Sequence, residues 1–484
     1  MADVVVGDGV SSFGNFNGST QAPIQAAVDS LPNGGVIYIR RGTYNFSAPL
    51  ALPYKPFTFF GDGDEQTILK RATDIVMIPL VDNLTVEEIE FENAAATYPT
   101  GNGCLQYTDS RTTNALSVDL KDVSIRRCSF RQRDTNPAAA LLVTRETIDY
   151  ISNFAFCDNK IVYGLVTSGS VQNQAVGIHG RERDISTISR TVGGVVTVTT
   201  SANHGYLVGR QVNVVDAVVG TDRLTNGRWT IASTPALNQF TYNTGVLSAI
   251  SGGAGAAATA WSGGLVSRTE FRNNIKVGGG CMFVVWGVNY DVQITGNISL
   301  EAAGPAGGYG EISVRDAADG SIANNTINSA EHAGIHLGLG AGGGAGSMVV
   351  TGNVVHGVVG SGIYVVGNGS ASGKFPVCTV VGNFILSASG DGIAVQNGKD
   401  SPGLLSQYMI TNNHIRSCSA YNLALLSAGP VGAANGGVSV LIVHNNGYAA
   451  GAAGIYPPGI TFDTGLGNTS IVEKNIFNTT NAAW

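Results

Sequence analysis

The stretch "VTGNVVHGVVGSGIYVV", residues 350–366, sets the pattern that decides the fold of this 484-residue chain. A single Asn stands between apolar pairs, and a Gly-Ile-x-Val run follows it. The arrangement returns along the second half of the chain at intervals of 23 to 33 residues. The repeated residues are Asn274, Asn297, Asn325, Asn353, Asn383, Asn413, Asn446 and Asn475. A period in this range is typical of proteins built from stacked units.

Each unit contains two or three short runs of alternating apolar residues, separated by Gly, Asn and Ser. Such runs predict strands, and the separators predict turns. No unit holds an amphipathic segment of helical length, which excludes leucine-rich and ankyrin-type repeats. The repeat therefore predicts a parallel β-helix, in which each unit forms one coil around a shared core.

The repeated Asn has a physical reason in such a fold. Strands of successive coils lie about 4.8 Å apart, so an inward Asn meets its equivalents in the coils above and below. Its amide donates and accepts hydrogen bonds at this spacing, as in stacked cross-β ladders. The register extends upstream to Asn159, Cys128 and Ile89, and its eleven positions predict a rod roughly 50 Å long.

The composition supports short strands and tight turns. Gly accounts for 66 residues, about twice its usual share, and charged residues for 13%, about half of theirs. The net charge of −7 argues against nucleic-acid binding. Six scattered cysteines predict buried free thiols, with no metal site and no cofactor. We find neither a Sec signal nor a span of ~20 apolar residues, so we expect synthesis in a cytoplasm without membrane insertion.

Residues 17–44, "NGSTQAPIQAAVDSLPNGGVIYIRRGTY", contain a short amphipathic segment. Ser19 or Thr20 is suited to cap the start of a helix there. This helix is expected to cover the first coil and hide its unpaired strand edges. The apolar residues on its inner face are Ile24, Ala27, Val28 and Leu31.

The same segment resembles the start of the pectate-lyase-like β-helix superfamily. The matching residues are Asn17, Gly18, Ile24, Gln25, Ala27, Gly34, Gly35, Val36, Tyr38, Ile39, Gly42 and Tyr44. "FFGDG" at 59–63 is similar to the first-coil turn of that family. The resemblance implies an all-β, right-handed parallel β-helix. Proteins that open in this way are often bacteriophage tailspikes or secreted polysaccharide-degrading enzymes, and the missing Sec signal favours the tailspike type.

Residues 188–262 interrupt the repeat. Their alternating apolar residues predict four or five antiparallel strands, similar to small β-barrel modules of phage tail proteins. We expect the capping helix and first coils in residues 1–187, the inserted module in 188–262, and the remaining coils in 263–484. His204 is expected to have a structural role within the module.

The Gly-Ile-x-Val strands predict a functional face. Positions that point away from the core by alternation carry unusual side chains for a chain with so little charge. These residues are His179, Arg181, Trp286, Glu311, Arg315, His336, Tyr364 and Gln396. Aromatic rings stack on sugars and Arg binds carboxylates, which favours a groove for an acidic polysaccharide. The alternative is a solvated face in which Trp286 stacks between two arginines.

The chemistry of this face stays open between hydrolysis, elimination and binding alone. Glycosidases need two carboxyl groups roughly 5–9.5 Å apart, and Glu311 has no clear partner. Elimination needs a base and charge neutralisation, for which the resemblance to pectate lyases implies Arg315 with His336. The calcium-binding Asp cluster of pectate lyases and the Asp triad of polygalacturonases are both missing. The predicted catalytic residues are Glu311, Arg315 and His336, and the predicted substrate-binding residues are His179, Arg181, Trp286, Tyr364 and Gln396, with no metal.

Three functional hypotheses follow. The first is a phage tailspike, located in the virion, that binds a host-surface polysaccharide with or without cleaving it. The second is a structural or receptor-binding virion protein without enzymatic activity. The third is a bacterial polysaccharide lyase or hydrolase. The fold family further implies a homotrimer that contacts the host glycan and other tail proteins.

Overall fold

The structure of the chain is a computed structural model. It describes residues 3–94, 103–107, 118–132, 141–143, 148–163, 174–179, 182–215, 217, 219, 224–255, 258–263, 266–286, 289–301, 310–317, 319–330, 332–339, 347–367, 377–397, 406–427, 438–443, 446–448, 452–455, 471–473 and 476–478.

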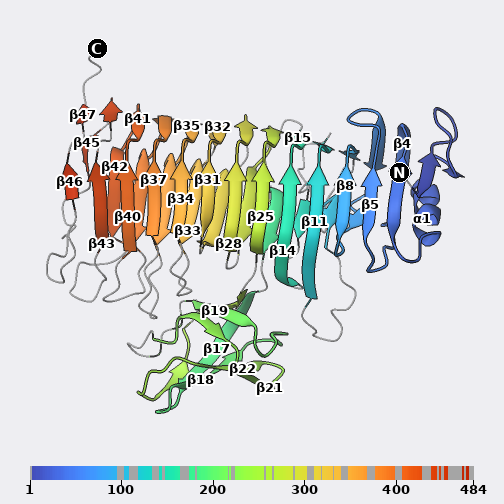
Figure 1. Ribbon diagram of the computed structural model, residues 1–484. Helices are drawn as coiled ribbons and strands as arrows, with labels where there is room; N and C mark the ends of the chain where they lie inside the picture. The colour runs from blue at the N-terminus through green and yellow to red at the C-terminus, as the bar shows by residue number, and fades with distance from the viewer. Residues whose placement is uncertain are drawn as a thin grey trace.

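Most coils of the rod contain three strands (Figure 1). One coil, for example, consists of β31 (Gly320–Ala323), β32 (Thr326–Ala330) and β33 (Ile335–Leu339). Each of these strands pairs in parallel with its equivalent in the next coil. The pairings build three long sheets, which confirms the predicted parallel β-helix. We call the sheets 1, 2 and 3, in the order in which the chain meets them within a coil.

The strands of the three sheets have the following bounds. Sheet 1 comprises β1 (Val4–Gly7), β3 (Gly35–Ile39), β5 (Phe57–Phe60), β8 (Leu84–Glu87), β11 (Val118–Arg126), β14 (Ile148–Cys157), β25 (Val266–Arg272), β28 (Asn289–Thr295), β31, β34 (Ser347–Thr351), β37 (Val377–Val381), β40 (Ser406–Thr411), β43 (Val438–Val443) and β46 (Ile471–Glu473), with β2 (Phe16–Asn17) beside β1. Sheet 2 comprises β4 (Gly42–Phe46), β6 (Thr67–Arg71), β9 (Glu90–Asn93), β12 (Ser129–Gln132), β15 (Lys160–Tyr163), β26 (Ile275–Val277), β29 (Ile298–Leu300), β32, β35 (Val354–Val358), β38 (Phe384–Ala388), β41 (His414–Arg416), β44 (Asn446–Tyr448) and β47 (Ile476–Asn478). Sheet 3 comprises β7 (Ile78–Pro79), β10 (Leu105–Gln106), β13 (Leu141–Val143), β16 (Gln174–His179), β27 (Cys281–Trp286), β30 (Ile312–Ala317), β33, β36 (Ile363–Gly367), β39 (Ile393–Asn397), β42 (Tyr421–Ser427) and β45 (Ala452–Ile455).

The core runs along the inside of the rod because alternate residues of every strand point inward. In the coil of β31–β33, Ile322, Ile327 and Ile335 are all buried. The 13 strands of sheet 2, about 4.8 Å apart, make the stack about 58 Å long.

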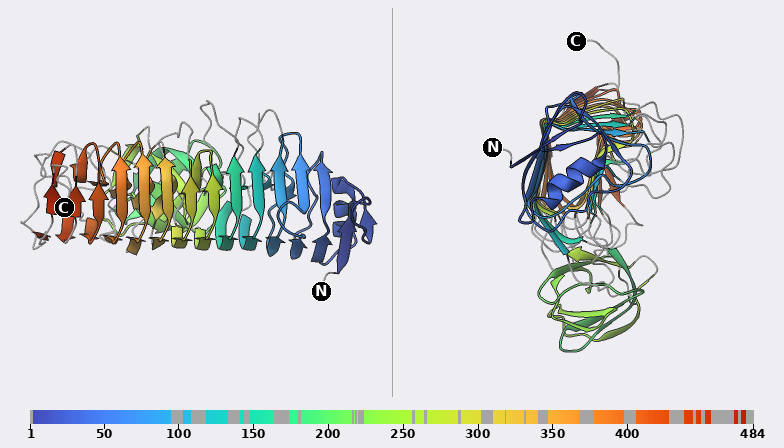
Figure 2. Two further views of the ribbon diagram at one scale, coloured as in Figure 1. Left: turned by 90° about the horizontal axis from the view of Figure 1, so that it is seen from above. Right: turned by 90° about the vertical axis from the view of Figure 1, so that its right-hand side faces the viewer.

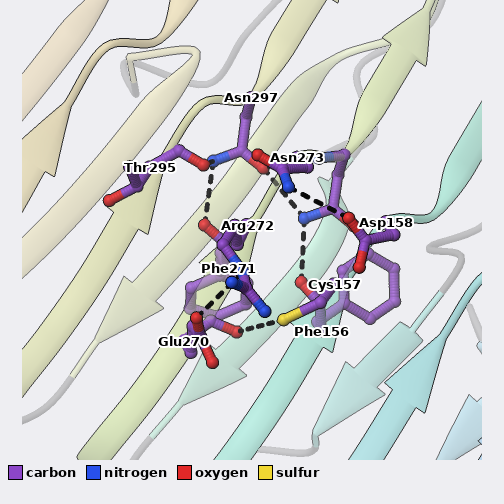
Figure 3. A network of polar contacts seen from close by, with 10 residues as sticks. Phe156, Cys157, Asp158, Glu270, Phe271, Arg272, Asn273, Thr295 and Asn297 are labelled. Carbon is purple, nitrogen blue, oxygen red and sulfur yellow. Dashed lines mark hydrogen bonds and ion pairs between the residues drawn. The ribbon is translucent and has the colours of Figure 1, made fainter.

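The predicted Asn ladder lies at the turn from sheet 1 to sheet 2. From Asn159 to Asn413, each Nδ2 donates to the Oδ1 of the next Asn at 2.8–3.1 Å. From Asn159 to Asn413, the residue before each ladder Asn has a positive φ, as Asp158 (58°) and Asn273 (54°) do. Figure 3 shows these two side chains in contact, with Asn273 Nδ2 donating to Asp158 Oδ1 at 3.0 Å. The side chain of Asn446 and all of Asn475 lie outside the described residues.

The predicted capping helix is α1 (Gln21–Asp29), which crosses the end of the coil stack (Figure 2). Thr20 is its N-cap, and the Thr20 hydroxyl accepts a hydrogen bond from the Ala22 N–H at 3.3 Å. Ile24, Ala27 and Val28 are buried against the first strands. Among the described ranges, no helix is long and apolar enough to cross a membrane.

The inserted module is antiparallel and has its own core. It leaves the rod between β16 of sheet 3 and β25 of sheet 1, and Figure 1 places it on the opposite side of the rod from sheet 2. His204 is buried in it: the His204 Nδ1 accepts the Tyr206 N–H at 2.8 Å, and Nε2 lies 3.0 Å from the Gln239 carbonyl. The strands are β17 (Glu182–Arg190), β18 (Val195–Thr200), β19 (Gln211–Val215), β20 (Gly227–Thr230), β21 (Ser233–Ala236), β22 (Gln239–Asn243), β23 (Ile250–Gly253) and β24 (Thr259–Gly263).

The prediction of buried free thiols is confirmed. All six cysteines are free and buried. Burial raises the pKa of Cys128 and of Cys378 to about 12, which keeps these thiols protonated and unreactive near neutral pH.

Candidate functional site

The predicted column on sheet 3 forms in the expected register. Ser313 pairs with His336, and His336 pairs with Tyr364. The His336 and Tyr364 rings lie 5.2 Å apart. One column further along the strands, Val366 pairs with Gln396. Stacking therefore places residues about thirty positions apart in contact, as the repeat predicted.

Aligning the Gly-Ile-x-Val strands by their sequence motif predicts that His179 lies opposite Val284, and this prediction is wrong by two residues. His179 pairs with Trp286 rather than with Val284, and Gly177 pairs with Val284. In the later coils the Gly of the Gly-Ile motif lies in the turn before the strand, whereas Gly177 lies within β16. Aligning the motifs therefore gives the wrong register. The corrected register places His179 and Trp286 on neighbouring strands. The side chains of His179, Trp286, Arg315 and Gln396, and all of Arg181, lie outside the described residues.

The expectation of an open face on sheet 3 is wrong at most described positions. Val284, Ser313, Ala394 and Ala424, whose side chains point away from the core by alternation, are at most 1% exposed. His336 is also buried. Tyr364 is partly exposed, and partial burial raises its pKa. Within the described residues, this sheet presents Tyr364 rather than a continuous groove.

Glu311 points into the rod, not outward as predicted. Its side chain is only 2% exposed, and Oε1 lies 2.6 Å from Lys276 Nζ. The same oxygen accepts a hydrogen bond from the Ser299 hydroxyl at 2.5 Å. Lys276 Nζ also donates to the Gly280 carbonyl. Glu311 is therefore one half of a buried ion pair that ties sheet 2 to the start of sheet 3.

The inward position of Glu311 follows from the bend before each sheet 3 strand. Later coils have Gly at this position, and a Cβ on Gly334 would lie 2.4 Å from Val355 Cγ1. A side chain at this position thus points at sheet 2. At the coil of Glu311, sheet 2 presents Lys276 and Ser299 in place of a branched apolar residue, which leaves room for the carboxylate.

A second group of candidate functional side chains lies on the outer face of sheet 2, and the sequence analysis did not predict it. Two columns run across β6, β9, β12 and β15. In one column Lys70, Glu92 and Arg131 alternate in sign, and Lys70 Nζ lies 2.8 Å from Glu92 Oε1. In the other column Glu90, Ser129 and Lys160 are neighbours.

The turn at residues 61–66 closes over these columns. Arg131 Nε lies 3.4 Å from Glu90 Oε1, and Arg131 Nη2 lies 3.0 Å from Glu65 Oε1. The Glu65 N–H donates to Glu90 Oε2 at 3.0 Å. Lys160 Nζ lies 3.5 Å from Asp64 Oδ2. We call Asp64, Glu90, Arg131 and Lys160 the charged cluster.

The two carboxyl groups of the charged cluster have pKa values shifted in opposite directions. Burial raises the pKa of Glu90, which is 1% exposed, and contact with Asp64 adds to the shift against the opposing charge of Arg131. Burial alone would also raise the pKa of Asp64. Contacts with Ser129 and Glu90, together with the charge of Lys160, instead bring it below its usual value. This arrangement favours a proton on Glu90 beside a carboxylate on Asp64.

A paired acid and base beside two cations is suited to proton transfer on an anionic substrate. The sequence signal was the dense charge of "VEEIEFEN" at 86–93, in a chain with 13% charged residues. Ile89 and Cys128 occupy equivalent ladder positions, so the residues that follow them, Glu90 and Ser129, could have been predicted to be neighbours. Among the described residues, no group of acidic, His and Cys side chains is arranged to hold a metal ion.

The comparisons with known proteins agree with the fold. Residues 10–222 match a family model described as rhamnogalacturonase A/epimerase, pectate lyase-like. This match is less than half of the chain and contains the whole charged cluster. It confirms the pectate-lyase-like resemblance for this part of the chain. No curated protein matches in sequence.

Solved structures with a similar fold cover almost the whole chain. The catalytic domain of a GH87 α-1,3-glucanase in complex with nigerose aligns over 93% of this chain and 67% of that chain, with 12% identity and a TM-score of 0.52. The mannuronan C-5 epimerase AlgE4 A-module of Azotobacter vinelandii aligns over 94% and 95%, with 12% identity and a TM-score of 0.42. The periplasmic alginate epimerase AlgG aligns over 93% and 78%, with 9% identity and a TM-score of 0.39. All three neighbours are enzymes that process polysaccharides, and the likeness to the glucanase, at 12% identity and a TM-score of 0.52, shows the fold alone.

Proposed function

We propose that the protein binds and hydrolyses an acidic polysaccharide of a bacterial surface, with the charged cluster as its active centre. The observation that carries the proposal is the pair of carboxyl groups, Asp64 and Glu90, whose pKa values are moved apart beside Arg131 and Lys160. Groups with perturbed pKa values concentrate at functional sites. The polysaccharide-processing enzymes among the structural neighbours support the substrate class.

Each residue of the charged cluster then has a chemical role. Glu90, protonated, supplies a proton to the glycosidic oxygen, and the Asp64 carboxylate stabilises the positive charge that develops on the sugar. Asp64 and Glu90 contact each other, so they are closer than the roughly 5–9.5 Å at which a second carboxylate activates water or attacks the sugar. Arg131 and Lys160 bind carboxylates of the polymer. Because Arg131 also contacts Glu65, whose side chain is 65% exposed, a substrate carboxylate that displaces Glu65 gains access to Glu90.

A second candidate function is binding without turnover. The observation that favours it is the 1% exposure of Glu90, since an acid must reach the bond that it protonates. In this case the charged cluster contributes ion pairs to stability and a recognition surface for the polymer.

Substitution of the two carboxyl groups separates these functions. We expect Glu90→Gln and Asp64→Asn each to lower the rate of polysaccharide cleavage by about 10²–10⁴-fold while binding persists. The measurement is the release of reducing ends from a panel of acidic bacterial polysaccharides, with circular dichroism to verify folding. Glu88→Gln is the matched control, because Glu88 is also paired with an arginine, Arg127, but lies outside the charged cluster.

The outcomes of this experiment are distinct. If both variants cleave at the parental rate, the charged cluster is not the active centre. The site predicted on sheet 3 is then tested with Arg315→Ala and Trp286→Ala. Binding without cleavage by the parent supports the second candidate. An ultraviolet-absorbing unsaturated product indicates elimination in place of hydrolysis.

The pH profile of cleavage is an independent check. Glu90 must be protonated, so the rate falls as pH rises through its raised pKa. Asp64 must be ionised, so the rate falls as pH drops through its lowered pKa. We therefore expect a plateau that is wider on both sides than two ordinary carboxyl groups would allow, and Glu90→Gln should remove the alkaline limb.

The biological setting that we propose is a phage tail, in which the protein is a trimeric tailspike that acts outside the host cell. The opening motif and the inserted antiparallel module support this setting. Sedimentation equilibrium should give three times 49.9 kDa, and a mass of one chain would contradict the trimer. If the protein binds encapsulated cells and no longer binds them after the capsule is removed, the capsule glycan is the host contact.

A further inference from the structure

The outer face of sheet 2 changes character after the charged cluster. From β26 to β41 its outward positions are mainly apolar, and several remain accessible. Ile275 is 42% exposed and Phe384 is 50% exposed, which is unusual for side chains of this size on a parallel sheet. We call the outer face of β26, β29, β32, β35, β38 and β41 the apolar stripe.

Arg416 is the one charged side chain at the outward positions of the apolar stripe. The outward positions of its six strands hold no carboxylate. They do hold His356, His414 and Arg416, and both His356 and Arg416 are exposed. The nearest acidic residue in sequence, Glu301, follows the end of β29. In a chain with a net charge of −7, a face with an arginine and no carboxylate repels a polyanion less than the acidic parts of the surface do.

The apolar stripe also carries aromatic rings and polar side chains, which are the groups that bind sugars in proteins. The Phe384 and His414 rings lie 5.6 Å apart on neighbouring strands and form an aromatic platform. His356 Nδ1 lies 3.1 Å from Asn328 Oδ1, which places a polar pair on the same face. The strands recur about every 4.8 Å, a distance similar to the length of one sugar residue in an extended chain. The surface therefore repeats along the rod axis at a spacing similar to the repeat of a polysaccharide chain.

The apolar stripe is continuous with the charged cluster. Lys160, on β15, pairs directly with Ile275, on β26. From Glu90 on β9 to Phe384 on β38 there are seven strand steps, or about 34 Å. The inserted module lies on the opposite side of the rod (Figure 1) and leaves this path clear.

We propose that an acidic polysaccharide lies along the rod axis on the apolar stripe, which presents the polymer to the charged cluster. The inference rests on the proposed function and adds the binding path and the length of chain that the protein recognises. It predicts that several sugar residues beyond the cleavage point contribute to affinity. Cleavage then takes place within the polymer rather than at a free end.

The test is equilibrium binding of acidic oligosaccharides of increasing length to the Glu90→Gln protein. Affinity should rise with length until the fragment spans the path to Phe384. Phe384→Ala and Arg416→Ala, each in the same background, should weaken binding of the long fragments about tenfold, equivalent to about 1.4 kcal/mol, and leave the short ones unchanged. Met409→Ala is the matched control, because Met409 is 40% exposed but lies on β40 of sheet 1.

The possible results separate the two proposals. If long fragments bind Phe384→Ala and Arg416→Ala as well as they bind the parent, the binding path is wrong while the active centre stands. If no acidic oligosaccharide binds at any length, both proposals fail. If Phe384→Ala instead reduces an oligomer to the mass of one chain and leaves glycan binding intact, the stripe is a contact between copies of the chain and the inference is overturned.

Discussion

The two halves of sheet 2 avoid repulsion between stacked like charges in different ways on their outer faces. Neighbours in a column lie about 4.8 Å apart, so like charges placed in succession would repel. The N-terminal half alternates its charges, as Lys70, Glu92 and Arg131 do. The C-terminal half avoids carboxylates altogether. The charged cluster lies where the charges of neighbouring strands alternate in sign.

The interiors of the two halves differ as well. The Asn ladder begins at Asn159, whose Oδ1 accepts the Cys128 N–H at 2.9 Å. Upstream of this point Cys128 and Ile89 occupy the ladder position, and both are buried. The Lys276–Glu311 pair lies in the first coils after the inserted module, at the boundary between the halves.

The largest effect is expected at the buried ion pair. Lys276→Met leaves the Glu311 carboxylate buried without a cation, and we expect a loss of about 3–5 kcal/mol in the free energy of unfolding. Lys276→Met combined with Glu311→Gln should lose clearly less than the sum of the two single changes. Urea unfolding measures both. A loss below about 1 kcal/mol for Lys276→Met would mean that Glu311 is solvated, which would restore its predicted outward role.

The Asn ladder gives the next largest effect. Asn353→Ala removes the hydrogen bonds from Asn353 Nδ2 to the Ile322 carbonyl and to Asn383 Oδ1, both 2.9 Å. It also leaves the Asn325 N–H without its acceptor. Since the freed groups are buried, we expect a loss of about 3 kcal/mol in unfolding free energy.

Asn328→Ala is the control for the ladder, because Asn328 lies on the outer face of the same coils and is exposed. A loss within about 0.5 kcal/mol is expected for this variant. Equal losses at Asn353 and Asn328 would show that the ladder contributes no more than a surface residue.

Charge reversal on the two halves of sheet 2 is expected to have the smallest effect of the three. Arg131→Glu removes the cation beside buried Glu90 and adds a third carboxylate next to Glu65, so a loss of about 2 kcal/mol is expected. Arg416→Glu, on a face without carboxylates, should change stability by less than about 0.5 kcal/mol. Thermal unfolding of the two variants compares them directly. The division between halves would be refuted by equal changes.

The sequence predicts the fold well because the same strand and turn preferences recur in every coil of the stack. The Asn ladder, the helix α1 and the pairing of His336 with Tyr364 all follow from period and alternation. The same reasoning fails where alternation ends. Glu311 lies in the bend before β30, and its direction depends on Lys276 and Ser299 from other coils.

The candidate site was harder to predict than the fold. Asp64 is in a turn, and Glu90 lies in the N-terminal half, where no Asn marks the register. Contact between them depends on how the turn at 61–66 folds over sheet 2, a tertiary feature that no spacing in the sequence encodes. Burial, which moves the pKa of Glu90, is likewise a property of the assembled coils.

The most direct test of the account is a crystal structure of the Glu90→Gln protein with an acidic oligosaccharide that the parent protein cleaves. We expect sugar residues on the outer face of sheet 2, with a glycosidic bond at Asp64 and Gln in place of Glu90, and with the chain extending toward Phe384. Sugar residues on sheet 3 beside Tyr364, with sheet 2 empty, would contradict it.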